Sequence, residues 1–299
     1  MASNALQQRL ARRFVHLLSG STDGKPPWLS AVADGDEGGF FLPGDAPWIV
    51  HRDFATLVGG VRALLLQALH PGALGGVAQH SRYEDDPLGR LSGTIRWLTV
   101  TTFGSMTAIR NEAGRVNKMH DRVAGEYEKN SGEKTKYRAA DQDLLLWVHI
   151  AFMDSFLRTH QNYSTNPIPG GADAYVAQWS RSVGPLGLDK VPMSERELVE
   201  VLDYYRPQLR VDENAKSVIS WIRNAPLPRA AKPAYRLLFH SALGTLPKDF
   251  RQMIGIRSYP LWMLRPITTF LLMLGRKAIG PDSPIEDAAK ARLSRVGLI

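Results

Sequence analysis

The sequence predicts an all-α protein with roughly ten helices in a single domain. Apolar residues recur at three- and four-residue intervals along most of the chain, which is typical of amphipathic helices. The chain shows no sustained apolar–polar alternation, glycine-rich phosphate loop, nucleophile elbow or internal repeat. Its 299 residues, 44% of them hydrophobic, suffice for one large core or two modest ones. We expect an N-terminal helix and wrapping arm (1–47), a helical core (48–260) and a C-terminal helix and tail (261–299).

The first part of the chain is predicted to contain two helices joined by an arm. One helix covers residues 4–18 and ends at Gly20. Residues 20–47 are rich in glycine, proline and aspartate, and are expected to wrap the body of the protein. A second helix covers about residues 53–69, before Pro71. The small residues of segment 72–80 then permit close approach of a neighbour or a flat ligand.

Two further helices and a connector are predicted between residues 86 and 140. Asp86 and Pro87 are suited to open the first helix. Ser105 is a plausible N-cap for the second, and Gly125 a plausible residue just past its end. The charged residues of this second helix, Glu112 included, are expected in water. The polar segment 126–140 is predicted to be a mobile connector.

The remainder of the chain is predicted to be a series of helices. Asp141 is expected to cap a long helix, and Ser194 to Glu197 match a capping box that opens a helix ending near Tyr205. The other helices are predicted near residues 172–183, 212–223, 230–243, 247–254, 260–275 and 288–295.

The helix after Ser105 carries a histidine in its apolar stripe. The stripe consists of Met106, Ile109, Ala113, Val116 and Val123, and His120 fills the missing step. One interpretation is a core histidine whose ring nitrogens are both hydrogen bonded. The other is a ligand to a metal or a haem iron, for which neutral imidazole is the commonest donor. His149 is a second histidine on an apolar helix face.

Composition limits the function classes. The absence of cysteine excludes disulfides, iron–sulfur clusters, thiolate-ligated haem and thiol nucleophiles. The formal net charge of +8 favours anionic partners. No basic run is interleaved with aromatic residues, so nucleic acid is not an expected partner. The N-terminus has no apolar signal core, and we therefore expect a cytoplasmic protein.

The apolar stretch 261–274 is the longest in the chain. Arg265 and Pro266 interrupt it, so it predicts a buried core helix rather than a membrane span. A helix that lies against a bilayer or covers a pocket is the alternative, and it allows peripheral contact with a membrane.

Helix-borne histidines in a cysteine-free, aromatic-rich chain suit haem better than zinc or a di-iron centre. A zinc site commonly uses short spacings such as His-Glu-x-x-His, and a di-iron site needs Glu-x-x-His on two helices. Neither occurs here. Haem needs one imidazole, a large apolar slot and cations near its propionates. Arg90, Arg96 and Arg122 are candidates for those cations, with solvated surface charges as the alternative.

Several segments, in this order, resemble the DUF2236 family, which includes the latex-clearing rubber oxygenases and the MpaB-type oxygenases. They are Leu66–Pro71, His80–Thr94, Phe103–Gly104, Val116–Gly125, Tyr137–Ala139 and Leu146–His149. The resemblance covers about residues 38–260. It implies a b-type haem in a globin-like helical core, and cleavage of an isoprenoid double bond by dioxygen.

The resemblance also implies roles for individual residues. His120 would be the proximal haem ligand, and Arg90 and Thr94 would line or support the distal side. His149 is expected near the cofactor or in the core, and is the next candidate ligand. The rubber oxygenases have a lysine directly before this threonine, whereas this chain has Gly93. We therefore expect a more open distal side, with five-coordinate or water-ligated iron.

The resulting hypothesis is a haem b oxygenase that acts with dioxygen on an apolar small molecule or lipid. The alternatives are a non-catalytic haem or lipid-binding helical protein at membrane surfaces, and a related fold that has lost haem binding.

Overall fold

The protein is predominantly helical, as the sequence predicts. The computed structural model describes residues 5–80, 87–280 and 283–299, and these contain fifteen α-helices, two short 3-10 helices and one β-hairpin. The all-α prediction is confirmed, although the helices outnumber the expected ten. Part of the excess comes from two short helices, one within the N-terminal arm and one that begins at its end.

The helices of the first half are α1 (Ala5–Ser19), α2 (Leu29–Ala33), α3 (Ala46–Arg52), α4 (Ala55–Leu69), α5 (Pro71–His80), α6 (Pro87–Phe103) and α7 (Met106–His120). The hairpin strands β1 (Ala124–Glu128) and β2 (Lys134–Arg138) follow. The second half comprises α8 (Gln142–Tyr163), α9 (Gly171–Trp179), η1 (Ser180–Leu186), α10 (Glu195–Tyr205), η2 (Arg206–Gln208), α11 (Glu213–Arg223), α12 (Lys232–Gly244), α13 (Lys248–Ile254), α14 (Leu261–Ile279) and α15 (Pro284–Arg295). The predicted helix 172–183 is therefore an α-helix followed by a 3-10 segment.

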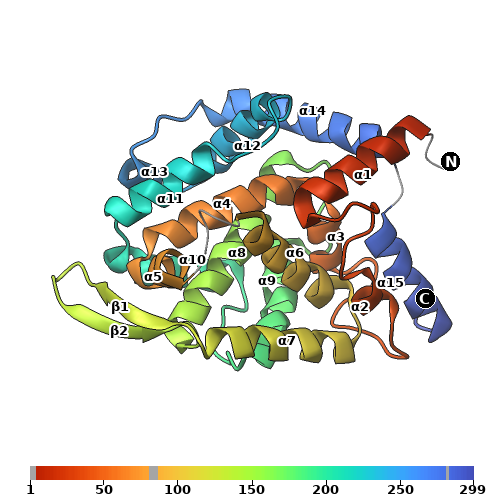
Figure 1. Ribbon diagram of the computed structural model, residues 1–299, viewed down its shortest axis with the longest axis horizontal. Helices are drawn as coiled ribbons and strands as arrows, with labels where there is room; N and C mark the ends of the chain where they lie inside the picture. Colours follow the sequence, from red (N-terminus) through yellow and green to blue (C-terminus); the bar gives the residue numbers. More distant parts are fainter. Residues whose placement is uncertain (1–4, 81–86, 281–282) are drawn as a thin grey trace.

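Helices α4 and α8 cross at the centre of the molecule (Figure 1) and form its most extensive described helix pair. Gly59 of α4 permits the close crossing, because a Cβ there would lie 2.6 Å from the Phe156 ring. Beside it, the Arg62 guanidinium forms a buried ion pair with Asp154 at 2.6 Å. Most buried apolar residues belong to one connected cluster around this pair.

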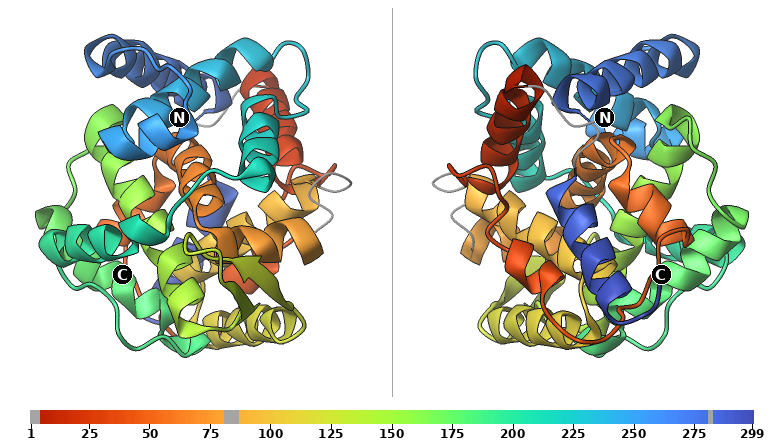
Figure 2. Two further views of the ribbon diagram at one scale, coloured as in Figure 1. Left: turned by 90° about the vertical axis from the view of Figure 1, so that its left-hand side faces the viewer. Right: turned by 90° about the vertical axis from the view of Figure 1, so that its right-hand side faces the viewer.

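The other helices surround this central pair. α12 and α11 pack on α4, and α14 packs on α12, so these helices form the upper side of the molecule in Figure 1. α6 and α7 pack against each other, and α7 lies along the lower side. The two further views in Figure 2 show the same separation of α7 from the helices of the upper side.

The C-terminal helix α15 holds the N-terminal arm. The buried Arg292 guanidinium donates to the backbone carbonyls of Val32 and Phe103. Glu286 accepts from the indole of Trp48 at 3.2 Å and pairs with Arg52 at 3.1 Å. Val32 of the arm and helix α3 at its end are therefore held by side chains that are remote in sequence.

The predicted mobile connector 126–140 is instead largely an antiparallel hairpin, with Gly125 opposite Tyr137. Its inward side chains include Tyr127 and Tyr137, which pack on α5. Cβ atoms at Gly72 and Gly75 would lie 2.9 and 3.0 Å from these two rings, respectively. The small residues of 72–80 thus admit a neighbour, as predicted for that segment. The prediction of a mobile connector was wrong. Along both strands, charged residues alternate with small or aromatic residues, and without aliphatic residues this alternation was not recognised as a strand pattern.

The apolar stretch 261–274 was predicted to be a buried core helix, and this is only half correct. Leu264, Thr268 and Leu272 of α14 are buried, whereas Trp262 and Phe270 are exposed on another side. Within the described ranges, no helix is both long and apolar enough to cross a membrane.

Candidate functional site

His120 is the last residue of α7. The helix begins as predicted, because the Ser105 hydroxyl accepts from the backbone N–H of Ala108 at 3.2 Å. It ends earlier than predicted: Val123 N–H donates to the His120 carbonyl at 3.0 Å in a turn. Gly125 belongs to β1, so its prediction as the residue just past the helix end was wrong. The short turn leaves His120 at the junction between α7 and the hairpin.

The imidazole of His120 is half-buried and chemically free. Its Nδ1 is buried without a hydrogen-bond partner, and no described group bonds the ring. Burial lowers the pKa of His120, and the charge of Asp121 opposes this shift. Burial therefore favours the neutral form, which is the form that ligates iron. Among the described residues, no group supplies the hydrogen bonds that the first interpretation above, a core histidine with both nitrogens satisfied, requires.

His149 of α8 has a similar environment but is more deeply buried. Its side chain belongs to the buried polar residues, and Nε2 has no hydrogen-bond partner among the described groups. Burial lowers the pKa of His149 to about 3, so the ring is neutral at physiological pH. His149 is therefore also chemically able to act as a ligand.

Three other histidines are tied to neighbouring groups. His51 contacts the Thr102 hydroxyl at 2.8 Å and the Tyr175 hydroxyl at 3.0 Å. His70 Nδ1 accepts from the first backbone N–H groups of α5. His160 Nε2 lies 2.7 Å from the Asn166 carbonyl. Each of these rings has at least one bonded nitrogen, although His70 Nε2 and His160 Nδ1 are also buried without a described partner. His120 and His149 differ from them because no described group bonds either ring. The ring of His240 also lacks a described hydrogen bond, but it packs on Tyr259 at 5.0 Å.

The residues expected on the distal side belong to α6. The side chain of Arg90 lies outside the described residues. Thr94 is half-buried on the same helix. A Cβ at Gly93 would meet no described atom within 4 Å. Sterically, a side chain at position 93 is therefore tolerated, and the glycine is not required by close packing against the described residues.

Glu112 joins α6 to α7, contrary to the prediction that it lies in water. Its side chain is 2% exposed, and its carboxylate accepts from Arg96 Nε at 2.8 Å and from Arg115 Nη2 at 2.6 Å. Arg96 was a candidate cation for a propionate, but it is bound to Glu112. Arg122, another candidate, is exposed. The Glu112 contact was missed because its partner Arg96 lies on the preceding helix.

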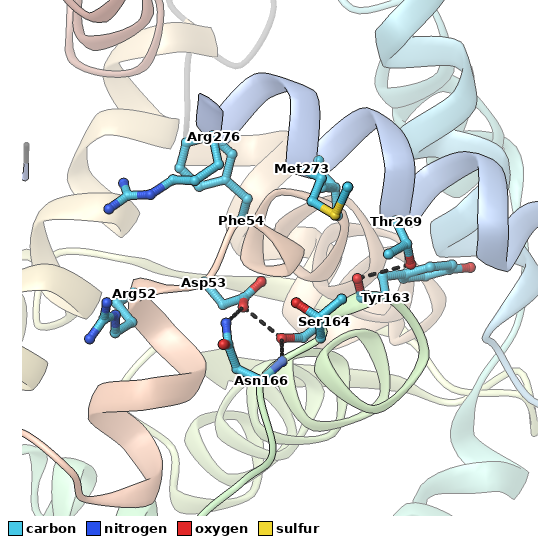
Figure 3. Close-up of a pocket in the computed structure, with 11 residues that line it drawn as sticks. Arg52, Asp53, Phe54, Tyr163, Ser164, Asn166, Thr269, Met273 and Arg276 are labelled. Carbon is cyan, nitrogen blue, oxygen red and sulfur yellow. Dashed lines mark hydrogen bonds between the residues drawn. The ribbon is translucent and has the colours of Figure 1, made fainter. Parts of the chain in front are cut away.

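A pocket of about 120 Å³ lies between α14, the start of α4 and the end of α8 (Figure 3). Asp53 Oδ2 accepts there from the Ser164 hydroxyl at 2.6 Å and from Asn166 Nδ2 at 2.9 Å. Ligand pockets typically occupy about 300–1,000 Å³, so this one is too small for a porphyrin. It also lies beside α14, on the opposite side of the molecule from α7 in Figure 1. We assign it to packing, and the sequence pattern gave no signal for it.

The donor set is compatible with haem in one respect. No described group bonds the ring of His120, and burial lowers its pKa, which favours the neutral form that can ligate iron. Among the described residues, no group of three or more histidine, aspartate or glutamate side chains is arranged to hold a bare metal ion.

Comparison with known proteins gives one match. Residues 48–276 match the family model described as "ER-bound oxygenase mpaB/B'/Rubber oxygenase, catalytic domain". The matched range includes Arg90, Thr94, His120 and His149, and it extends through most of α14. No curated protein and no solved structure matches the chain significantly.

Proposed function

Because this chain belongs to the mpaB/rubber oxygenase catalytic-domain family, we propose that it is a haem b-dependent oxygenase that acts with dioxygen on an apolar small molecule or lipid. The family is one of oxygenases, which supports an enzymatic function. The resemblance noted in the sequence is confirmed by the family match. The haem, the substrate class and the residue roles are the proposed part.

The observation that carries the proposal is the free imidazole of His120. Buried polar groups are normally hydrogen bonded, and no described group bonds the ring of His120. The ring is therefore open to a ligand, which supports a role in binding iron. His120 lies within the family match and in the Met-His-x-x-Val-x-Gly segment. We therefore assign His120 as the proximal residue that holds the iron.

The other residues would position reactants. Arg90 and Thr94 would steady dioxygen or a haem propionate on the distal side, and His149 would support the cofactor from α8. Haem, when bound, supplies the oxygen chemistry, and the protein supplies binding and orientation. Gly93 offers no side-chain donor, so Thr94 and Arg90 would act there without the lysine of the rubber oxygenases.

The test is an absorbance spectrum with iron analysis of the purified full chain. We expect a Soret band and about one haem per chain, either as isolated or after haemin is added. His120→Ala should lose the band, whereas His149→Ala should retain most of it. His240→Ala is the matched control, because its ring also lacks a described hydrogen bond. A colourless protein that does not bind added haemin, or a His120→Ala variant with full haem content, would contradict the proposal.

A second variant probes the distal side. Gly93→Lys introduces the side chain found in the rubber oxygenases, and the described atoms leave space for its Cβ. If Gly93 faces the iron, the variant should convert the spectrum from high spin to low spin. An unchanged spectrum would place Gly93 away from the distal side.

Oxygen uptake separates an enzyme from a carrier. Reduced haem-loaded protein is mixed with candidate apolar lipids in an oxygen electrode. Uptake that depends on lipid and is lost in Arg90→Ala supports an oxygenase. Tight lipid binding without uptake supports the non-catalytic alternative.

A further inference from the structure

The exposed side of α14 is almost entirely apolar. We define the α14 apolar face as Trp262, Pro266, Ile267, Phe270, Met273 and Leu274, all of which are exposed. Trp262 is 74% exposed and Phe270 57% exposed. Their positions lie on one side of the helix over four turns, opposite the buried Leu264, Thr268 and Leu272. Such a continuous row of large apolar side chains on a surface marks an interaction site.

The chain segment that contains this face carries positive charge only, although the Asp53 carboxylate lines the pocket beside Met273. No carboxylate occurs between Asp249 and Asp282. This interval contains five basic residues: Arg251, Arg257, Arg265, Arg276 and Lys277. Of these, Arg257, Arg265 and Lys277 are exposed. The apolar face is therefore bordered by cations, and no anion of its own segment neutralises them.

Helix α1 adds to this positive charge. α1 packs beside α14 on the upper side of the molecule in Figure 1, where the Gln7 side chain donates to the Lys277 carbonyl at 2.9 Å. α1 carries exposed Arg9, Arg12 and Arg13 and no acidic residue. Two neighbouring helices thus both carry exposed basic side chains and no acidic residue.

We propose that the α14 apolar face docks on the surface of an anionic lipid bilayer, with α14 lying in the plane of the interface. Interfacial helices combine an apolar face with lysine and arginine, and exposed tryptophan favours the headgroup region. The basic side chains would then contact anionic headgroups. This inference goes beyond the proposed function, and it does not depend on haem.

The charge pattern favours a bilayer over a second copy of the chain. A symmetric dimer through this face would bring the same basic residues together, and like charges would repel each other. An anionic membrane instead complements them. Within the described part of the chain, no helix is long and apolar enough to cross the membrane, so the proposed mode is peripheral.

The experiment measures co-sedimentation of the full chain with vesicles. The probes are vesicles of phosphatidylcholine alone and vesicles of phosphatidylcholine with phosphatidylglycerol in a 7:3 ratio. We expect binding to the anionic vesicles, weaker binding in high salt, and little binding to phosphatidylcholine alone. Failure to bind the anionic vesicles at low salt would overturn the proposal, whatever the result of the haem experiments.

Surface variants locate the binding face. The double variant Trp262→Ser with Phe270→Ser should bind anionic vesicles at least tenfold more weakly. The double variant Met193→Ser with Tyr204→Ser is the matched control, because these residues are 53% and 65% exposed but lie elsewhere. Removing the charge of Arg257 or Lys277 with Gln should weaken binding by about fivefold each. Thermal melting verifies that each variant is folded.

Two results would overturn the assignment of this face. One is equal vesicle binding by the Trp262→Ser/Phe270→Ser variant and the wild type. The other is a wild-type dimer in light scattering that this variant abolishes while vesicle binding is absent, which would assign the face to a second copy.

Discussion

His51 and His120 lie in the last turns of two helices, yet their rings have opposite environments. The Thr102 hydroxyl donates its hydrogen to the Leu98 carbonyl at 2.7 Å, so this hydroxyl can only accept from His51 Nδ1–H. In the neutral ring Nε2 then carries no hydrogen, and it accepts from the Tyr175 hydroxyl. The ring of His120 has no such bond. Burial lowers the pKa of both histidines. Burial and the lowered pKa therefore do not distinguish a structural histidine from a candidate ligand. Its hydrogen bonds mark His51 as structural, whereas His120, like His240, has none among the described groups.

The region around His51 continues into a densely paired centre. The Asp154 carboxylate pairs with Arg62 at 2.6 Å and with Arg158 at 3.1 Å, and Arg62 also donates to the Ser155 hydroxyl at 3.0 Å. α7 also has a buried carboxylate, Glu112, but it pairs with Arg96 and Arg115 and not with His120. The contrast is therefore between the two histidine rings.

The largest expected effect tests the paired centre. Asp154→Ala leaves the buried Arg62 without its carboxylate, and should lower the free energy of unfolding by about 3–5 kcal/mol. Urea denaturation measures the change. Glu200→Ala is the matched control: it removes the exposed pair with Arg196, and should change stability by about 0.5 kcal/mol at most. A loss below about 1 kcal/mol for Asp154→Ala would show that the pair does not stabilise the core.

A smaller effect compares the two histidines directly in haem-free protein. His51→Phe retains a ring but leaves the buried Tyr175 hydroxyl unpaired, which should lower stability by about 1–3 kcal/mol. Adding Tyr175→Phe should restore much of the loss, because both partners are then apolar. His120→Phe should have little effect, since its ring has no hydrogen bond to lose. Equal losses of stability in His51→Phe and His120→Phe would show that the two rings do not differ in their hydrogen bonding.

A third test is a pH dependence. Burial lowers the pKa values of His51 and His149 to about 3 in the folded protein. Below about pH 6.5 these two histidines are therefore protonated in the unfolded chain but stay neutral in the folded protein. Stability should therefore fall as the pH drops from 6.5 toward 3, by up to about 1.4 kcal/mol per pH unit for each ring. Urea midpoints of haem-free protein between pH 7 and 5 measure this slope. The slope should decrease in His149→Phe, and an unchanged slope would contradict the shift.

Much of the helical fold could be predicted from local signals. The Ser105 N-cap and the Ser194 capping position are both confirmed, since each hydroxyl accepts a backbone N–H in the first turn. Asp141 occupies the predicted N-cap position, but its carboxylate accepts from Arg138 N–H at 2.7 Å instead, which closes the hairpin. Apolar periodicity indicated where the long helices lie. It misplaced the end of α7 because Val123 continues the stripe after the helix has stopped.

The candidate site was predictable in part. The stripe indicated an inward His120, and its half-burial agrees with this. The sequence could not show whether its ring nitrogens have partners, because those partners would come from distant segments. The same limit applies to His51, whose partners are Thr102 and Tyr175, and to Glu112, which is held by Arg96. Long-range polar contacts leave no periodic trace in a single sequence.

The anchoring of the N-terminal arm by α15 has a consequence for biosynthesis. Arg292 and Glu286 emerge from the ribosome long after Val32, Trp48 and Phe103, the residues they bind. Val32 of the arm, and the neighbouring Trp48 and Phe103, therefore lack these stabilising partners until α15 has been translated. Nascent chains that stall before α15 should expose this arm to proteases and chaperones, although the central helices have already been synthesised.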